Sequence, residues 1–363
     1  MPSKPLVFPQ DHNSHETVIE WWYFNGSLRD AAGNAYSFMD CLFKADIDKV
    51  AIPYLKHISR KKPGSKSRYV YFAHSIVSDI GKQKNHKEVQ NISLVSNDSF
   101  NQKRLFIDYI DPVIVHGFVN NEIAEVAPDT FHIKTNNLDL VLKSKKSPLL
   151  EGGEGYITVC GRDSYYYSLT DMEASGTLSI EGKKIEVKGA AWMDHQWADV
   201  SYRQDKWTWF SMQLDDGTDM MCCEYDDGKS KDFLIDIIEK NGAQHHLNKL
   251  ILRPADEKWK SPLTKAEYPL AWDIEIPDYD AKLHIKSLMT DQEMIFMAIN
   301  YWEGPIKISG TIGGKNVKGN GFMELVGYPT DYNYLLSVGK EIGKKIADML
   351  NEKMHKKASI PVL

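Results

Sequence analysis

Apolar and polar residues alternate along most of the chain, in short stretches separated by turn residues. Successive side chains of a β-strand point to opposite faces, so this period of two predicts strands that bury one face. Long examples are Glu20–Leu28, Ala35–Phe43, Lys184–Trp197 and Val317–Val326. Glycine and acidic residues, as in Asp30–Gly33, mark the turns between them. We therefore predict an all-β protein built from antiparallel strands.

A strand pattern occurs once in each half of the chain, which indicates a duplicated β-domain. The matching segments are an aromatic opening strand, at residues 21–30 and 207–216, and an acidic closing strand, at residues 175–194 and 309–324. In the closing strand Asp194 aligns with Glu324. Since only Asp194 is followed by the sequence HQW, the pair favours one active and one silent half.

The spacing of the strands suggests a closed architecture. Many short strands are typical of sandwiches and barrels, and barrel closure removes exposed strand edges. We predict two consecutive antiparallel β-barrels, at residues 1–203 with an extended leader and at residues 204–334. Residues 335–363 form a C-terminal α-helix and tail, because apolar side chains recur every three or four residues within 335–357. That helix either packs on a barrel wall or lies on a membrane surface with its lysines.

Composition limits the partners. A length of 363 residues exceeds a single typical core and suits two domains. The formal net charge of −6 argues against nucleic acid or an anionic membrane. No apolar run approaches the roughly 18 residues of a membrane span, so we expect no integral membrane segment. The oligomeric state stays open.

The N-terminus and the cysteines bear on location. The first residues contain no apolar secretory segment, and the four cysteines form no CxxC pair. We expect reduced thiols in a cytoplasmic protein. Peripheral membrane contact, and a mature secreted form whose signal has been removed, stay open.

The strand Val187–Trp197 contains the leading candidate for chemistry. Alternation places Trp192, Asp194 and Gln196 on one face, with His195 on the other. A carboxylate beside large aromatic side chains inside a barrel is poorly solvated, and desolvation raises the pKa of an aspartate. Asp194 is then either a general acid or a structural group that binds backbone amides at a domain junction.

Other aromatic and ionisable residues fall on strand faces. In SYYYS, Tyr165 and Tyr167 share one face and Tyr166 takes the other, either for packing or for catalysis. In the first aromatic strand Glu20 and Trp22 lie opposite Tyr23. One of these two faces must line an interior.

The histidines provide weaker signals. His74 lies on a predicted strand and is either a core residue or part of a cavity wall. His12 and His15 form HxxH in a Pro-flanked leader without a helix to present them, so we expect no metal there. Neither a G-x-S-x-G elbow nor a glycine-rich phosphate loop occurs. We therefore expect no cofactor.

Several segments, in order over nearly the whole chain, resemble a known family. They are HETVIEWWYFNGSL (15–28), YFAHSIVSD (71–79), SYYYSLTDMEASGTL (164–178), GAAWMDHQWAD (189–199), WTWFSMQLDDG (207–217), DQEMIFMAINYWEG (291–304) and GNGFMELVGY (319–328). The chain is similar to the carotenoid 1,2-hydratase (hydroxyneurosporene synthase) and AttH-like family of paired lipocalin-type domains. The resemblance implies two lipocalin-like barrels and places the chain among hydratases of isoprenoid double bonds, polyene cyclases and members without assigned activity.

The resemblance also implies roles for residues. Asp194 is the expected proton donor, and Tyr165 and Tyr167 fall in the upstream strand that completes the catalytic set. We assign substrate binding to the aromatic and polar residues near these positions, which are Trp192, Gln196, Glu20, Trp22, Tyr23 and His74. The chemistry requires a neutral acid, an aromatic face for a carbocation and a held water.

Three functions follow from this set. The first is a cofactor-independent hydratase or isomerase that protonates an apolar, alkene-bearing small molecule. The second is a lipocalin-like binder or carrier of a hydrophobic ligand without catalysis. The third is a polyene cyclase in which the cavity only folds its substrate.

Overall fold

The computed structural model describes residues 4–46, 48–50, 69–98, 104–115, 121–200, 205–296 and 299–329. About two thirds of these residues lie in strands, and the pairings in the sheets are antiparallel, which confirms the predicted fold class. The predicted helix within 335–357 lies outside the described residues. Of the helices in the described part of the chain, none combines the length and the apolar character that a membrane span requires.

The first half of the chain forms a 12-stranded sheet. Its strands are β1 (Ile19–Arg29), β2 (Ala35–Asp46), β3 (Tyr69–Asp79), β4 (Lys84–Asp98), β5 (Phe106–Val115), β6 (Glu122–Ala127), β7 (Thr130–Lys134), β8 (Leu138–Ser144), β9 (Leu149–Leu150), β10 (Tyr156–Val159), β11 (Arg162–Ile180) and β12 (Lys183–Ala198). The sheet closes on itself because β8 pairs with β11. Short 3-10 helices η1 (Gln10–His12) and η2 (Glu151–Gly153) precede β1 and β10.

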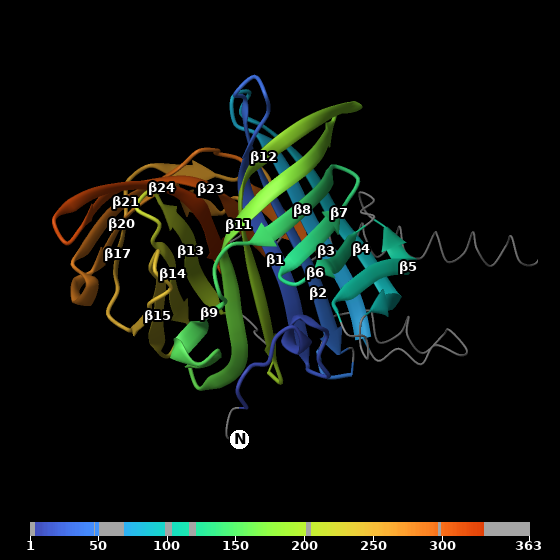
Figure 1. Cartoon of the computed structure of the whole chain (residues 1–363), viewed down its shortest axis with the longest axis horizontal. Helices are drawn as coiled ribbons and strands as arrows, with labels where there is room; N and C mark the ends of the chain where they lie inside the picture. The colour runs from blue at the N-terminus through green and yellow to red at the C-terminus, as the bar shows by residue number, and fades with distance from the viewer. Residues whose placement is uncertain are drawn as a thin grey trace, which may run out of the picture.

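The second half forms a curled 10-stranded sheet. Its strands are β13 (Lys206–Leu214), β14 (Asp219–Asp226), β15 (Lys231–Ile238), β16 (Gln244–Leu247), β17 (Ile251–Pro254), β20 (Ala271–Ile276), β21 (Ala281–Ser287), β22 (Glu293–Phe296), β23 (Ile299–Ile312) and β24 (Lys315–Val326). A small ribbon of β18 (Lys258–Lys260) and β19 (Glu267–Pro269), and helix η3 (Pro277–Tyr279), complete it. Figure 1 shows the two sheets side by side, with β11 at their junction.

The sequence repeat corresponds to a structural one. The hairpin β11–β12 pairs with β1, and the hairpin β23–β24 pairs with β13. In these registers Asp194 lies opposite Tyr23, and Glu324 lies opposite Trp209. The two aligned acids therefore occupy equivalent places in the two sheets.

A glycine repeated in the acidic strands marks a close approach between strands. A Cβ on Gly189 would lie 2.0 Å from the carbonyl oxygen of Ser27, and one on its counterpart Gly319 would lie 2.3 Å from that of Gln213. Neither position tolerates a side chain. The glycines let the acidic strands approach their aromatic neighbours.

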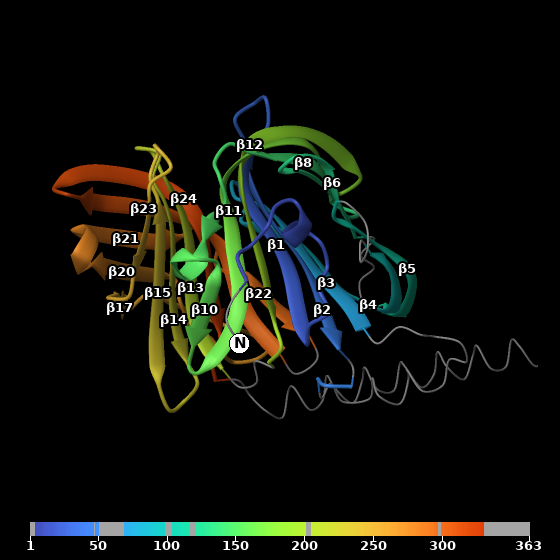
Figure 2. The same cartoon turned by 60° about the horizontal axis from the view of Figure 1, so that its bottom comes forward.

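The buried apolar residues fall into three clusters. One fills the first sheet and includes Trp22 and Phe24, and another fills the second sheet and includes Phe210. The third lies between the sheets and includes Trp192 and Trp209. Figure 2, turned from the first view, shows β11 and β13 next to each other at this boundary.

Candidate active site

A cavity of about 180 Å³ lies between the two sheets. Most of its walls are aromatic, from Trp21 and Tyr23 on β1 to Trp207 and Trp209 on β13. Three carboxyl groups reach it, those of Asp194, Glu303 and Glu324. No lysine or arginine occurs among the described residues that line it. The cavity therefore suits an uncharged, apolar molecule better than an anion.

Asp194 is bound by three hydrogen-bond donors. Ser168 Oγ and Trp192 Nε1 each lie 2.6 Å from Oδ1, and Tyr166 OH lies 2.8 Å from Oδ2. The residue is only 4% exposed. Burial raises the pKa of Asp194 to about 6, even though the three donors lower it. This carboxyl group is thus able to hold a proton near neutral pH.

Two further carboxyl groups face Asp194 from the second sheet. Glu303 on β23 lies directly opposite Glu324 on β24, and Trp207 Nε1 lies 3.1 Å from Glu324 Oε2. Burial, with the charge of Asp194, raises the pKa of Glu324 to about 7. Burial and the charge of Glu324 raise the pKa of Glu303 well above its ordinary range. Glu324 thus lines the same cavity as Asp194, so the two acids do not mark two separate cavities.

The tyrosine nearest to Asp194 is Tyr166. Its hydroxyl group accepts a hydrogen bond from Trp209 Nε1 at 3.1 Å and donates one to Asp194, so it links the sheets. Ser168 lies opposite Asp194 in the register of β11 and β12, which puts Tyr166 on the same face. Sequence reasoning missed Tyr166, Ser168 and Glu303 as site residues. Knowledge of this strand register would have identified the first two.

A family model described as AttH-like matches residues 1–328. The chain belongs to the AttH-like family. The resemblance seen in the sequence is thereby confirmed. The match spans both sheets, including every residue that lines the cavity.

Two curated relatives of this AttH-like protein are named as a dehydratase and a hydratase. The dehydratase asqC of Emericella nidulans is 24% identical over 201 residues, which cover 52% of this chain and 57% of that protein. Kievitone hydratase of Fusarium solani subsp. phaseoli is 23% identical over 197 residues, which cover 52% and 56%. The chain therefore spans little more than half the length of the curated relatives it matches.

Solved structures match the whole fold of the AttH-like protein. An AttH protein from Nitrosomonas europaea superposes with a TM-score of 0.68 at 25% identity, covering 90% of this chain and 98% of that one. Kievitone hydratase from Nectria haematococca gives a TM-score of 0.66 at 16% identity, covering 89% and 93%. At that identity the second likeness concerns the fold alone. The lipocalin-like architecture expected from the sequence is confirmed.

The structure brings several predicted residues of the AttH-like protein to the cavity. Gln196, Tyr23 and His74 line it together with Asp194. His74 Nδ1 lies 2.5 Å from Tyr301 OH, and burial lowers the pKa of His74 to about 3, so its ring is neutral. Trp192 donates to Asp194 but does not line the cavity. We had expected a cavity inside a barrel. The cavity instead lies between the two sheets.

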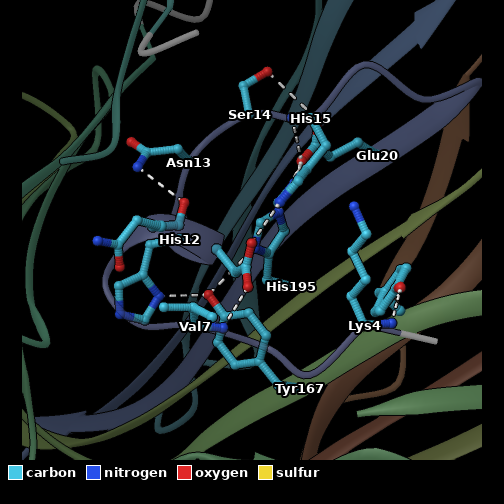
Figure 3. Close-up of polar contacts among 12 residues, drawn as sticks. Lys4, Val7, His12, Asn13, Ser14, His15, Glu20, Tyr167 and His195 are labelled. Atoms are coloured by element: carbon cyan, nitrogen blue, oxygen red, sulfur yellow. Dashed lines mark hydrogen bonds and ion pairs between the residues drawn. The ribbon is translucent and has the colours of Figure 1, made fainter. Parts of the chain in front are cut away.

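Other predicted residues lie away from Asp194. Tyr165 and Tyr167 are on the opposite face of β11, where Tyr165 stacks on Trp197 at 5.3 Å and Tyr167 OH lies 2.6 Å from His12 Nδ1. The side chains of Glu20 and Trp22 are also buried in the interior of the first sheet. Figure 3 shows Glu20 in the same group of residues as Tyr167. The structure therefore does not bring Tyr165, Tyr167, Glu20 or Trp22 to Asp194.

These residues instead build a second polar cluster inside the AttH-like fold. Glu20 Oε1 lies 2.8 Å from His15 Nδ1 and 3.0 Å from His195 Nε2, and Glu20 Oε2 lies 3.0 Å from Lys44 Nζ. Burial lowers the pKa of His15, but Glu20 and Asp11 outweigh it and raise that pKa to about 9. Lys44 and His15 lower the pKa of the buried Glu20 carboxyl. The leader is thus fastened to β1 and β12 by charge.

Within the part of the chain that the structure describes, two groups of side chains are able to hold a metal ion. The ligand atoms of His15, Glu20 and His195 lie within 4.8 Å of one another, a donor set that zinc accepts. The other group is His12, Glu125 and Asp129. In the structure the ammonium group of Lys44 provides the cation beside Glu20.

Proposed function

We propose that this AttH-like protein is a hydratase or dehydratase for an uncharged, apolar small molecule that contains an alkene or the corresponding alcohol. The observation that supports this most is Asp194, a buried carboxyl group with a raised pKa that reaches an aromatic cavity. The names of two curated relatives agree with the reaction class. We further propose that the substrate is an isoprenoid or polyene compound.

The chemistry needs a proton donor, a cation-stabilising face and a base. The protonated Asp194 gives its proton to an alkene carbon, which creates a tertiary carbocation and leaves the Asp194 carboxylate. The faces of Trp209 and Tyr23 stabilise that cation. A water molecule then adds, and its proton passes to a carboxylate on the second sheet. Dehydration follows the same path in reverse.

Glu303 and Glu324 suit the part of the base. Two carboxyl groups facing each other in a buried site resist simultaneous ionisation. One proton therefore stays with the pair, and the unprotonated carboxylate is able to accept a proton from the attacking water. With Glu324 ionising near pH 7, the pair is able to take and return one proton. Acid and base then come from different sheets. No cofactor is required by these steps.

Replacement of the acid tests the proposal. Asp194→Asn keeps the shape of the side chain but removes its proton, so turnover of a prenylated or polyene test compound should fall at least about 100-fold. Ligand affinity should change little. Asp219→Asn is the matched control, because Asp219 is also buried but binds Lys146 and Thr170 instead. Turnover in Asp194→Asn equal to that of the control would remove the assignment.

A non-catalytic binder is the second candidate. It is favoured by the chain of hydrogen bonds from Trp209 through Tyr166 to Asp194, which joins the two sheets. In that case Asp194→Asn should lower the melting temperature and the ligand affinity. Neither the wild type nor the variant should show turnover. A polyene cyclase, in contrast, would show a rate nearly independent of pH.

A further inference from the structure

Ser168 stands between two carboxyl groups. Its Oγ lies 2.6 Å from Asp194 Oδ1 and 2.7 Å from Glu151 Oε1, and all three side chains are buried. A hydroxyl group has a single proton to donate. If Ser168 donates to one carboxylate, the other carboxyl group must be protonated and donate to Ser168. The hydroxyl group is therefore placed to pass a proton between Glu151 and Asp194.

Glu151 continues this connection toward the second sheet. Among the described residues no donor reaches Glu151 Oε2, although it is buried. The Asp236 carboxyl group on β15 adjoins Glu151, because Asp236 Oδ2 accepts a hydrogen bond at 3.1 Å from the amide of Gly152, the next residue. Burial, then the charge of Asp236, raises the pKa of Glu151 well above its ordinary range. Of the two carboxyl groups that Ser168 bridges, Glu151 is thus the protonated one.

The connection ends at the surface. His246 Nδ1 on β16 lies 3.0 Å from Asp236 Oδ1, and the His246 side chain is 40% exposed. His246 also lines an open groove of about 500 Å³ together with Gly152, whose amide donates to Asp236 Oδ2 at 3.1 Å. Solvent therefore reaches the outer end of the series.

We propose that His246, Asp236, Glu151 and Ser168 form a proton relay that delivers protons from solvent to Asp194. The relay rests on the proposed function, because it recharges the acid that the reaction consumes. Glu151 gives its proton to Ser168 as Ser168 gives its own to the Asp194 carboxylate. His246 then returns a proton to Glu151 through Asp236 and takes one from solvent. The attacking water gives one proton to the pair of Glu303 and Glu324, and the pair returns that proton to solvent before the next turnover. One proton therefore enters and one leaves in each cycle.

The charged groups around the relay come from both sheets. Glu151 faces Asp236 and Asp194, while Asp194 faces Glu303 and Glu324 across the cavity as well as Tyr166. Asp236 also lies near Cys222, whose pKa burial raises. The basic groups among these neighbours are His74, which is neutral in the cavity wall, and Lys231, which lines the outer groove beside His246. The groups between His246 and Asp194 are carboxyl and hydroxyl groups, which are able to accept and donate a proton.

The test follows protonation of Asp194 without any substrate. Infrared spectroscopy of the full chain after release of a caged proton records the carboxyl band of Asp194, identified as the band that Asp194→Asn removes. Glu151→Gln replaces a neutral acid by a neutral amide of the same shape, and Ser168→Ala removes the bridging hydroxyl group. In both variants the rate of protonation should fall at least about tenfold.

The controls separate proton transfer from packing. Thr170→Val removes another buried hydroxyl group of β11, which binds Asp219 and does not touch the relay. His245→Gln matches His246→Gln, since His245 is 39% exposed and pairs with Glu239. Both controls should keep the wild-type rate, and added imidazole should restore protonation in His246→Ala.

The outcomes distinguish the relay from the proposed function. Unchanged protonation rates in Glu151→Gln and Ser168→Ala would overturn the relay, whatever Asp194→Asn does to turnover. An unchanged rate of Asp194 protonation in His246→Gln would show that protons do not enter the relay at His246. A slowed rate in the two inner variants supports the relay even if Asp194 proves unnecessary for turnover, because the measurement uses only the protein and protons. Should Ser168→Ala fail to fold, the isosteric Glu151→Gln decides.

Discussion

At the scale of single residues, the hydrogen-bond donors around Asp194 lower its pKa, whereas its burial raises it. Three hydrogen bonds stabilise the carboxylate, and the low polarity of the surroundings opposes them more strongly, so that the pKa settles at about 6. A small change in the donors should therefore move the pKa across the neutral range. Replacing Tyr166 by Phe removes one of these donors and leaves the aromatic ring in place.

Tyr166→Phe should shift the pH dependence of turnover upward. In the wild type the rate should fall about tenfold per pH unit only above about pH 7, because between pH 6 and 7 the ionisation of the base Glu324 offsets the loss of protonated Asp194. Without the Tyr166 donor the carboxylate is less stable, so the decline should begin at higher pH. The measurement is kcat as a function of pH. Tyr165→Phe is the control and should leave the profile in place, and an equal shift in both variants would contradict the argument.

The charge of Lys44 is a second residue-scale feature. Its ammonium group lies between Ser14, His15 and Glu20 and is 1% exposed. Removing one partner of a buried ion pair leaves an uncompensated charge.

Lys44→Met should lower the free energy of unfolding by about 3–5 kcal/mol at neutral pH. Since the folded-state pKa of Glu20 is lowered, the stability that Glu20 contributes exists above its unfolded pKa and is lost as the pH falls. The deficit of the variant should shrink in the same direction. Urea unfolding at several pH values measures it. Lys260→Met breaks an exposed ion pair with Glu267 and should change stability little, and a similar loss in both would argue against a buried charge network.

At the scale of elements, the repeated glycines decide how closely two strands approach. Gly189 sits opposite Leu28 in the pairing of β12 with β1, with no room for a Cβ. Displacing β12 would also displace Asp194, five residues further along.

Gly189→Ala should lower the free energy of unfolding by at least about 2 kcal/mol, because the strands must separate. Gly81→Ala offers the comparison, since a Cβ there would lie 3.7 Å from its nearest neighbour. Chemical denaturation of both variants tests this. If Gly189→Ala were as stable as Gly81→Ala, the close approach would not matter.

The strand β12 also shows why the sequence predicted part of the site and no more. Alternation correctly put Trp192, Asp194 and Gln196 on one face. Every residue from Ala191 to Ala198 is buried, however, because one face packs inside the first sheet and the other against the second. A strand buried on both sides gives no signal of which face looks inward. The choice of Tyr165 and Tyr167 over Tyr166 came from the family resemblance, and the burial pattern of the strands offered nothing to correct it.

At the scale of the whole molecule, the fold was more predictable than the site. Strand periodicity and the internal repeat determine two similar sheets, since both are properties of local sequence. The packing of one sheet on the other depends on contacts between residues far apart in the chain. Glu303 enters the cavity only through that packing, and although it lies in the matching segment 291–304, the sequence of that segment did not indicate a role for it.

The placement of the acids has a consequence for the history of the chain. Each half contributes a carboxyl group from the same repeated strand, and the two meet only where the halves touch. An undivided ancestor would have had to associate with a second copy of itself to bring two such groups together. Two copies within one chain are free to differ, and here one position is aspartate and the other glutamate.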